Sequence, residues 1–308
     1  MIRFSVIIVT YNRLALLKEC LNNVLNQTFT PNNITVVDNC SNDGTYEYLD
    51  NKFKSVGKLE VYHENCNVGG AGGFYRGLKL ALESCSNWFV FIDDDAILNL
   101  DYLEKIKESI ENNPKYLAFS GTVTTNGQII AEHRRRLFKR EVEVSLEEYN
   151  KENFEYDISS FCGVVFSRHL IDKIGLPEKE FFIWYDDTEY CMRSTKFTRI
   201  LNVNSAILNH KTNNYSKIQN KPFLYPWKAY YGFRNKIYTC LKHNMKLVAL
   251  SFILRIFIKS SLEIVIYPKK YSITFHNFKL VFASVCDGVL GKLGKNTKYL
   301  PQLLHFKN

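Results

Sequence analysis

The sequence predicts an α/β protein with a mostly parallel central sheet and a helical, basic C-terminal region. Over the first 125 residues, short β-branched or aromatic runs alternate with helix-length stretches, and this alternation is typical of βαβ units. The chain has 308 residues, of which 46% are apolar and 23% charged, a composition that supports a sizeable core. Acidic residues are concentrated before residue 190, and the chain beyond it is basic and rich in aromatic residues.

The expected elements follow one another in a regular order. The expected strands are 4–9, 34–38, 59–62, 88–92 and 116–120, and the helices between them are 13–26, 43–53, 72–84 and 101–111. Residues 126–156 are highly charged, which favours a solvated surface excursion over a specific binding role. The elements expected after them are a strand over 158–166, a short helix, the aromatic run 181–185, a helix over 186–197 and a strand-like run ending at His210.

The distribution of charge predicts two domains. Residues 1–190 carry 20 Lys/Arg and 29 Asp/Glu, whereas residues 191–308 carry 20 Lys/Arg and two acids, a balance of +18. A boundary between Pro222 and Pro226 divides the chain into residues 1–222 and 223–308. The basic C-terminal region predicts an anionic partner, either a phospholipid surface or a nucleic acid.

Residues 247–267 are long and apolar enough to suggest a membrane span. Within them, Ser251, Arg255, Lys259 and Glu263 recur every four residues and share one helical face. Burying that face in hydrocarbon would cost roughly 2.5–3.5 kcal/mol for a central Arg or Lys, so a spanning helix is disfavoured. A helix lying on an anionic lipid surface fits the pattern better. Packing on the protein's own core or in an oligomer interface is the alternative.

The cysteines and the N-terminal residues indicate in which cellular compartment the protein is expected. The eight cysteines form no CxxC pair and no zinc spacing. The N-terminal residues run directly into the first strand, without the charged region, apolar run and cleavage site of a leader. We therefore expect reduced thiols and a cytoplasmic location.

Three consecutive acids, Asp93, Asp94 and Asp95, directly follow the apolar run 88–92. Because parallel sheets bind ligands outside the carboxyl ends of their strands, these side chains are candidates for chemistry. Adjacent carboxylates repel one another unless a cation lies among them, and hard ions such as Mg²⁺ or Mn²⁺ prefer carboxylate oxygens. The motif therefore favours a divalent metal site, with an acidic cap on the following helix as the alternative.

Residues 67–73 (NVGGAGG) open an expected helix. Glycines permit close backbone approach, and a helix N-terminus favours an anion. Tyr75 occupies the place of the third glycine of a GxGxxG motif, and no Gly-Lys-Ser/Thr sequence occurs. Nicotinamide-dependent hydride transfer and P-loop hydrolysis therefore lack their usual motifs.

A second acidic set lies in residues 184–189 (WYDDTE). Carboxylates beside aromatic rings indicate a base with a raised pKa next to an apolar or sugar-stacking surface. An acidic first turn of the helix 186–197 explains the same residues equally well. His210 is a lone histidine at a strand end and is by itself more typical of a structural residue.

Together these motifs resemble the family 2 glycosyltransferases, which have the GT-A fold. The resemblance covers roughly residues 1–215, in the family's order, through the segments 6–13, 36–45, 67–73, 93–95 and 186–187. The glycine-rich segment, the triple Asp and the aromatic-Asp-Asp motif look more narrowly like bacterial galactofuranosyltransferases, and rhamnosyltransferases share much of this pattern. Residues 230–235 (YYGFRN) and 287–292 look like the C-terminal region of such polysaccharide-building enzymes.

The resemblance implies a role for each matching residue. The residues that would hold the nucleotide sugar are Thr10, Tyr11, Arg13, Asp38, Asn67, Gly69, Gly70, Asp94 and Trp184. Asp93 and Asp95 would approach a Mn²⁺ or Mg²⁺ ion, and His210 would complete its shell. Asp187 would be the base that deprotonates the acceptor hydroxyl, with Asp186 beside it in the catalytic site. Glu189 stands where some relatives carry Asp, which leaves its contact with the acceptor open.

The resulting hypothesis is an inverting, metal-dependent glycosyltransferase that uses UDP-galactofuranose. Its acceptor would be a glycan, free or polyprenyl-linked, in the synthesis of a cell-surface polysaccharide such as O-antigen or capsule. Residues 1–222 would form the GT-A catalytic domain, and residues 223–308 would bind the cytoplasmic face of the inner membrane peripherally through 247–267.

Two other enzymes remain as alternatives. One is a rhamnosyltransferase that uses dTDP-rhamnose. The other is a metal-dependent nucleotidyltransferase, which should carry a basic glycine-rich loop where this chain has residues 10–13 (TYNR). A nucleic-acid partner would leave the acids at the strand ends unexplained, so none is expected. The oligomeric state stays open.

Overall fold

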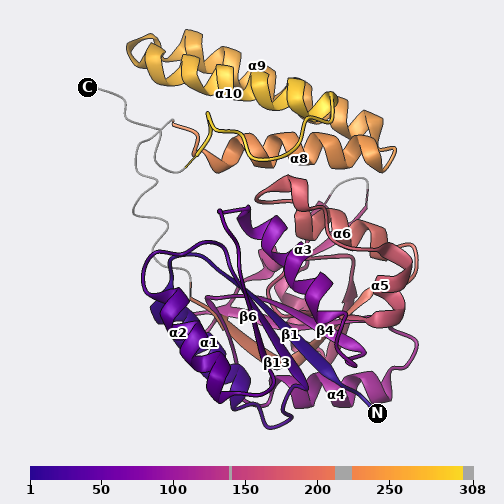
Figure 1. The fold of residues 1–308 in the computed structure, drawn as a ribbon. Helices are drawn as coiled ribbons and strands as arrows, with labels where there is room; N and C mark the ends of the chain where they lie inside the picture. The colour runs from indigo at the N-terminus through magenta and orange to yellow at the C-terminus, as the bar shows by residue number, and fades with distance from the viewer. Residues whose placement is uncertain (139–140, 212–223, 301–308) are drawn as a thin grey trace. The chain divides into compact units, whose positions relative to one another are not determined.

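The computed structural model of the protein describes residues 1–138, 141–211 and 224–300 and divides them into two compact units. The first unit comprises residues 1–179 and 187–211 and contains all strands of the described chain. The second comprises residues 180–186 together with 224–300 and is helical. Figure 1 shows the strands surrounded by helices in the first unit and the helices α8, α9 and α10 of the second.

The first unit is built on one large sheet in the strand order β10-β13-β6-β12-β4-β1-β2-β3, with β5 paired to β13 and β7 to β6. Its strands are β1 (Phe4–Thr10), β2 (Asn33–Asp38), β3 (Leu59–His63), β4 (Trp88–Asp93), β5 (Ala96–Leu98), β6 (Ala118–Thr125), β7 (Gln128–Ile129), β10 (Asn153–Tyr156), β12 (Val164–Ser167) and β13 (Ile200–His210). Strands β3, β2, β1 and β4 are parallel neighbours, and β12 runs antiparallel between β4 and β6. The predicted α/β class with a parallel central sheet is confirmed.

The parallel register brings the ends of three strands to one edge of the sheet. Thr10 of β1 lies opposite Asp38 of β2, and Val9 lies opposite Asp93 of β4. In parallel sheets, ligands bind at the edge formed by the carboxyl ends of the strands. The polar residues that follow these strands in the sequence therefore meet where a ligand is expected.

Helices cover both faces of the sheet. They are α1 (Leu14–Leu25), α2 (Thr45–Ser55), α3 (Gly69–Ala81), α4 (Tyr102–Asn112), α5 (Arg168–Ile174) and α6 (Asp186–Ser194). Side chains alternate along β1, and Phe4, Val6 and Ile8 pack in one buried cluster with residues of α1, α2 and α4. On the opposite face α3 approaches so closely that a Cβ on Gly77 would lie 2.5 Å from Ile7 Cγ2. Glycine at this position therefore sets the distance between α3 and the sheet.

The expected elements before residue 125 are all present, although the helix expected over 72–84 begins earlier, at Gly69. The single strand expected over 158–166 is wrong. The structure has two strands there, β11 (Ile158–Ser159) and β12, which belong to different sheets. Between them Gly163 has a φ of +79°, and a Cβ there would lie 2.2 Å from Leu208 Cδ2. The chain turns at this glycine, where no larger residue fits.

The charged segment 126–156 is more ordered than the sequence predicts. It supplies β10 of the large sheet and a small sheet in which β8 (Arg134–Leu137) lies between β11 and β9 (Glu141–Glu143). Arg134 is fully buried, so the expectation of a solvated face is wrong for this residue. Its guanidinium donates to the carbonyl oxygens of Gly121 (2.8 Å) and Cys162 (3.1 Å). A buried charge is tolerated because these acceptors satisfy it.

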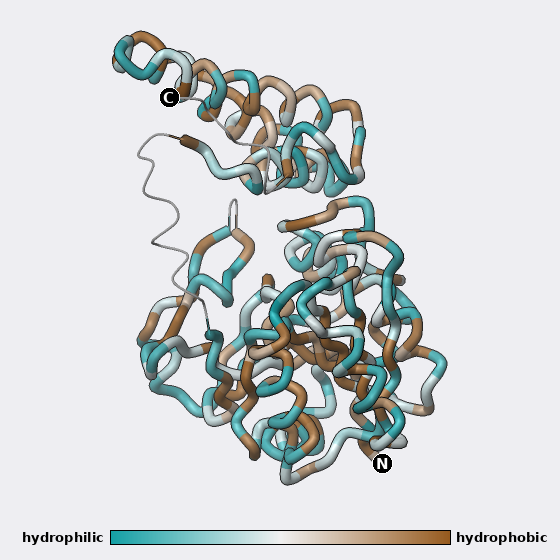
Figure 2. Tube along the Cα trace, turned by 60° about the vertical axis from the view of Figure 1, so that its left-hand side comes forward, coloured by the Kyte–Doolittle hydropathy of each residue, from teal (hydrophilic) through white to brown (hydrophobic). Residues whose placement is uncertain are grey.

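The second unit is a bundle of the helices α8 (Lys228–Lys242), α9 (Lys246–Ile266) and α10 (Tyr271–Val289). Ile237 of α8, Ile256 of α9 and Val281 of α10 pack together in a buried cluster. Within the described residues, no helix combines the length and hydropathy that a membrane span needs. Figure 2 shows hydrophobic stretches along these helices as well as in the strands of the first unit.

Helix α9 buries one face and exposes an apolar one. Ala249, Ile256 and Ser260 are buried. This face of α9 therefore packs on the protein itself, which was the alternative to a lipid surface. Its exposed apolar side chains include Leu247, Leu250, Leu254, Ile258, Leu262 and Val265, with exposed fractions of 51–82%. They recur every three or four residues and form one stripe along the helix. On the face expected to carry Ser251, Arg255, Lys259 and Glu263, the first three are exposed, whereas Glu263 is partly buried and accepts from the hydroxyl of Tyr225 (3.5 Å).

The division into units differs from the expected boundary in one respect. The change of domain expected near residue 222 falls outside the described residues. Residues 180–186 group with the helical unit, although the sequence assigns them to the first domain. The physical reason is hydrogen bonding, because Asn235 of α8 donates to the carbonyl oxygens of Phe181 and Trp184.

Candidate active site

The acidic triplet lies at the carboxyl end of β4 and is held by residues from the end of β1. The hydroxyl of Thr10 donates to Asp94 Oδ2 (2.7 Å). Arg13 Nη1 donates to both Asp94 Oδ1 (3.1 Å) and Asp95 Oδ2 (2.6 Å). Asp94 and Asp95 are buried, so the guanidinium offsets negative charge that water cannot solvate. The sequence grouped these residues in one binding edge but did not predict that Arg13 pairs with the acids.

Asp93, Asp95 and His210 form a cluster that could hold a metal ion. One ligand atom from each lies within 4.8 Å of the others, and His210 Nε2 is 3.1 Å from Asp95 Oδ1. The three residues come together because β5 folds back and pairs His210 with Ala96, next to the triplet. Two carboxylates and one imidazole are a donor set that suits Mn²⁺ or Mg²⁺. The residues present therefore fit a divalent ion.

The electrostatics of the cluster favour a bound cation. Burial, together with the charge of Asp95, raises the pKa of Asp93 to about 7. Burial also raises the pKa of Asp94 to about 6, against the opposing charge of Arg13. At Asp95 burial acts in the same direction, but the hydrogen bond and charge of His210 outweigh it and hold the pKa below its usual value. Burial thus makes Asp93 and Asp94 harder to ionise, and a divalent ion would supply the positive charge that favours their carboxylate forms.

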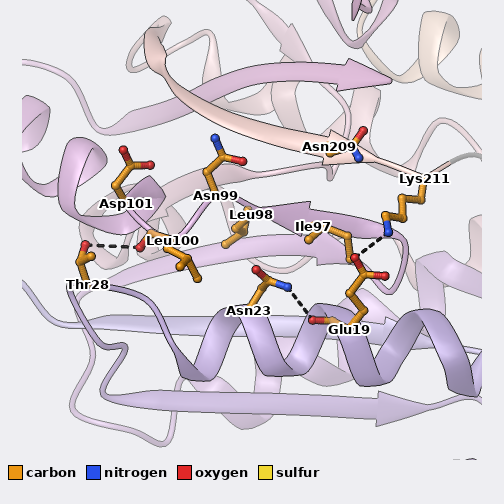
Figure 3. Close-up of a pocket in the computed structure, with 10 residues that line it drawn as sticks. All are labelled: Glu19, Asn23, Thr28, Ile97, Leu98, Asn99, Leu100, Asp101, Asn209 and Lys211. Atoms are coloured by element: carbon orange, nitrogen blue, oxygen red, sulfur yellow. Dashed lines mark hydrogen bonds and ion pairs between the residues drawn. The ribbon is translucent and has the colours of Figure 1, made fainter. Parts of the chain in front are cut away.

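Behind the cluster, the end of β13 is tied to α1. The backbone N–H of Lys211 donates to the carbonyl oxygen of Asp95 (2.8 Å), and its ammonium pairs with Glu19 (2.6 Å). Figure 3 shows this pair at one end of a hollow lined by residues of α1, β5 and β13. The volume of the hollow is about 630 Å³. Because Lys211 directly follows His210, these contacts fix the strand end that presents the imidazole.

The candidate nucleotide-binding residues lie at the same edge. The carboxylate of Asp38 accepts from the backbone N–H of Ser41 (3.0 Å) and contacts His63 Nδ1 (2.9 Å). Asn67 Oδ1 accepts from the backbone N–H of Gly69 (2.8 Å) at the start of α3. Nothing lies within 4 Å of a Cβ added to Gly70, so this glycine borders open space. Tyr11 is exposed. This side of the edge is therefore open next to a helix N-terminus, a favourable place for an anion.

The second acidic set begins helix α6. Asp187 Oδ1 accepts from the backbone N–H (2.5 Å) and the hydroxyl (3.1 Å) of Thr188. Burial raises the pKa of Asp187, against the charge of Arg135 and the hydrogen bonds of Thr188. Glu189 is buried and pairs with Arg193 (3.0 Å). These contacts give Glu189 a structural role within α6, whereas Asp187 keeps the properties of a candidate base.

Trp184 and Asp186 belong to the segment that groups with the helical unit. The side chain of Trp184 is 45% exposed, and Asp186 is buried. An indole that remains exposed offers an apolar face to a ligand such as a sugar ring.

The sequence of the first unit matches a known protein family. The family model described as "Glycosyl transferase family 2" matches residues 5–175, more than half of the chain. The chain belongs to glycosyl transferase family 2. The matched region contains the acidic triplet and the glycine-rich start of α3.

Relatives of this glycosyltransferase carry transferase names. The dTDP-rhamnosyl transferase RfbF of Shigella flexneri is 24% identical over 268 residues, which cover 85% of this chain and 87% of the relative. A GalNAc(5)-diNAcBac-PP-undecaprenol beta-1,3-glucosyltransferase of Campylobacter jejuni is 22% identical over 69% of this chain and 70% of its own length. TarS of Staphylococcus aureus is 33% identical, but only over 37% of this chain and 20% of TarS.

Solved structures show the same fold. S. aureus TarS 1–349 in complex with UDP has a TM-score of 0.56 at 19% identity, over 78% of this chain and 66% of that chain. GalNAc-T7 with UDP, GalNAc and Mn²⁺ has a TM-score of 0.61 at 14% identity, over 78% of this chain and 48% of that chain. The predicted GT-A fold is thereby confirmed for this transferase.

Some residues near the transferase site are not marked by any sequence motif. His133 Nδ1 lies 2.7 Å from the hydroxyl of Ser160, and its ring packs edge-on against His210 at 5.1 Å between centroids. Burial lowers the pKa of His133 to about 3, with help from the nearby Arg134. Arg135 donates to the hydroxyl of Thr188 (2.9 Å). Their sequence context is a charged run without a motif, so only the fold could reveal them.

Proposed function

We propose that this glycosyltransferase is an inverting, metal-dependent enzyme that transfers a sugar from a nucleotide sugar to a lipid-linked glycan. The observation that carries the proposal is the cluster of Asp93, Asp95 and His210 at the edge where β1, β2 and β4 end. An acidic cluster at this edge matches the need of a diphosphate leaving group for a counter-ion. A nucleotidyltransferase, the other class considered, lacks support from the family match.

Each residue at the edge has a proposed role. Asp93, Asp95 and His210 would hold a Mn²⁺ or Mg²⁺ ion, which would supply positive charge to offset that of the diphosphate. Thr10, Tyr11, Arg13 and Asp38 bind the nucleoside, and Asn67, Gly69 and Gly70 line the space for the donor sugar and diphosphate. Asp94 keeps Thr10 and Arg13 in place through the contacts described above.

Asp187 is the proposed base. It accepts the proton of the acceptor hydroxyl while that oxygen forms a bond to the anomeric carbon and the bond to the diphosphate oxygen breaks. The electron pair of the broken bond leaves with the diphosphate, and the anomeric centre inverts. A carboxylate whose pKa is raised by burial is better matched to this proton transfer than an exposed one. Asp186 contributes to acceptor binding, and Trp184 contributes to binding of the nucleotide sugar.

For the donor, we expect UDP-galactofuranose to be used in preference to dTDP-rhamnose, because of the resemblance of residues 67–74. The measurement is the release of UDP or dTDP by the full-length protein with Mn²⁺, using UDP-galactopyranose as the matched control for ring size. The second candidate donor is dTDP-rhamnose, which is favoured by the match to a dTDP-rhamnosyl transferase over 85% of this chain. Efficient release of dTDP, with none of UDP, would establish the second candidate and reject the first.

The proposed place of action is the cytoplasmic face of the cell membrane, in the synthesis of a polysaccharide such as O-antigen or capsule. Support comes from the exposed apolar stripe of α9, flanked by the exposed side chains of Arg255 and Lys259. Exposed apolar side chains beside basic ones are typical of helices that lie in a lipid interface. A surface of anionic lipid is the proposed partner, which would also hold the lipid-linked acceptor.

Changing Arg255 and Lys259 to Glu is expected to weaken binding to anionic vesicles by about 2 kcal/mol or more, since each basic side chain near such a surface contributes about 1 kcal/mol. Vesicle co-sedimentation at increasing salt measures this, and salt should release the wild-type protein. Lys54 and Lys107, which pair with acids on the first unit, give a control double variant with the same change in charge. Wild-type vesicle binding by the α9 variant would reject the lipid surface.

A further inference from the structure

The segment that precedes the proposed base has an unusual backbone. Phe182, Trp184 and Tyr185 have φ values of 66°, 64° and 73°. Positive φ is uncommon for any residue other than glycine, and for bulky side chains it is costly. Such a conformation persists only where the surrounding structure holds it firmly, and it is concentrated at functional sites. The backbone of residues 182–185 therefore needs contacts that hold it in this conformation.

Asn235 of α8 supplies the hydrogen bonds. Its Nδ2 lies within hydrogen-bond distance of the carbonyl oxygens of Phe181 (3.0 Å), Ile183 (3.1 Å) and Trp184 (2.8 Å). The side chain is fully buried, so water does not compete for these carbonyls. One amide group thus contacts three of the four peptide oxygens between residues 181 and 184.

Arg234 fixes the orientation of that amide. Its Nε donates to Asn235 Oδ1 (2.9 Å). Because a guanidinium can only donate, the oxygen of Asn235 must face Arg234, and the NH₂ group must face the carbonyls. Arg234 itself is buried and donates to the carbonyl oxygens of Phe181 (3.0 Å) and Gly294 (2.6 Å).

Neighbouring residues of α8 pack against the same segment. A Cβ on Gly232 would lie 2.8 Å from Trp184 Cε3, so the indole rests on the bare backbone of α8. The ring of Tyr231 lies 5.0 Å from that of Phe182. Together these residues account for the segment YYGFRN at 230–235, which the sequence marked only by resemblance.

We propose that Asn235, oriented by Arg234, is a positioning residue for glycosyl transfer: it fixes the backbone of residues 182–185, which presents Trp184 and leads directly into Asp186 and Asp187. The helical unit would then have two roles, positioning residues for the reaction and binding the lipid surface. This inference rests on the proposed function, because it takes Asp187 as the base and Trp184 as a contact of the nucleotide sugar.

The test is Asn235→Asp in the full-length protein. Asp has the same shape, and one of its oxygens can still accept from Arg234. Its second oxygen replaces the NH₂ group of Asn235, so it cannot donate to the three carbonyl oxygens. We expect kcat to fall by at least about tenfold, because a displacement of about 1 Å at a reacting group costs up to about 10²-fold. The affinity for Mn²⁺ should stay at its wild-type value, because Asp93, Asp95 and His210 are unchanged. Thr239→Val is the matched control, because Thr239 is buried on the same helix and its hydroxyl has no partner among the described residues.

Gly232→Ala is a second variant, which displaces the indole of Trp184 and leaves Asn235 in place. We expect a raised KM for the donor and an unchanged KM for the acceptor. Wild-type kinetics in both variants would overturn the inference, as would a loss of kcat in Asn235→Asp matched by an equal loss of folded protein or of Mn²⁺ affinity. The base is tested separately by Asp187→Asn. If that variant is inactive while Asn235→Asp is not impaired, the inference fails and the proposed function stands.

Discussion

Asp95→Ala is expected to abolish metal-dependent donor binding and to lower turnover by at least about 10³-fold, since metal stabilisation of a transition state is worth several kcal/mol. Asp95 has the central position in the site. Its two oxygens face different partners, with Oδ2 at 2.6 Å from Arg13 and Oδ1 at 3.1 Å from His210. Removing this carboxylate leaves Asp93 and His210 alone to hold an ion, and the diphosphate loses its counter-ion.

The fold should survive this substitution, because Arg13 keeps its pair with Asp94 (3.1 Å) and the repulsion within the triplet decreases. Mn²⁺ binding, measured by electron paramagnetic resonance, separates loss of the ion from loss of structure. Asp50→Ala is the matched control, since Asp50 is an exposed acid that pairs with Lys54 on α2. Normal turnover of Asp95→Ala in the presence of a chelator would remove the metal from the mechanism.

Asp187→Asn is expected to lower kcat by about 10²–10⁴-fold, the usual contribution of a general base, with donor affinity nearly intact. The amide keeps an oxygen for the two hydrogen bonds from Thr188, so the start of α6 should keep its shape. It cannot accept the proton of the acceptor hydroxyl. Steady-state kinetics and donor binding measured on the same preparation give both quantities.

The pH profile supplies an independent check of the same residue. A base acts when deprotonated, so activity falls as pH drops through its pKa. Burial raises the pKa of Asp187, with Glu141 acting in the same direction and Arg135 opposing it. The acid limb should therefore lie above the range of an exposed Asp and disappear in Asp187→Asn. Asp186→Asn should act on acceptor binding; an inactive Asp186→Asn beside a nearly normal Asp187→Asn would move the base by one residue.

Much of the first unit could be predicted from the sequence, because its signals are local. Short apolar runs such as 88–92 alternate with amphipathic stretches, and this alternation fixes both the elements and the α/β class. The position of Asp93, Asp94 and Asp95 followed from the same logic, since they come directly after a buried strand. The place of His210 was implied only by the resemblance, because His210 reaches the cluster through the pairing of β13 with β5, a contact between residues more than a hundred positions apart.

The features that could not be predicted depend on long-range packing. Arg134 lies in a run of charged residues that indicates a solvated surface, and only the assembled fold supplies the carbonyls that satisfy it. The strand expected over 158–166 is divided because Gly163 must turn beside Leu208. The clamp of Asn235 on residues 181–184 joins segments some fifty residues apart. Neither composition nor periodicity carries information about such contacts.

The most direct test of the central claim is nucleoside diphosphate release by the full-length protein. The protein is incubated with UDP-galactofuranose and, separately, with dTDP-rhamnose, each with Mn²⁺ or with a chelator, and UDP or dTDP is measured. A metal-dependent transferase that uses the cluster of Asp93, Asp95 and His210 should release one of the two in the presence of Mn²⁺. The chelator should abolish that release, and Asp95→Ala should show none. Release that persists undiminished in the chelator or in Asp95→Ala, or no release from either donor, would contradict the account.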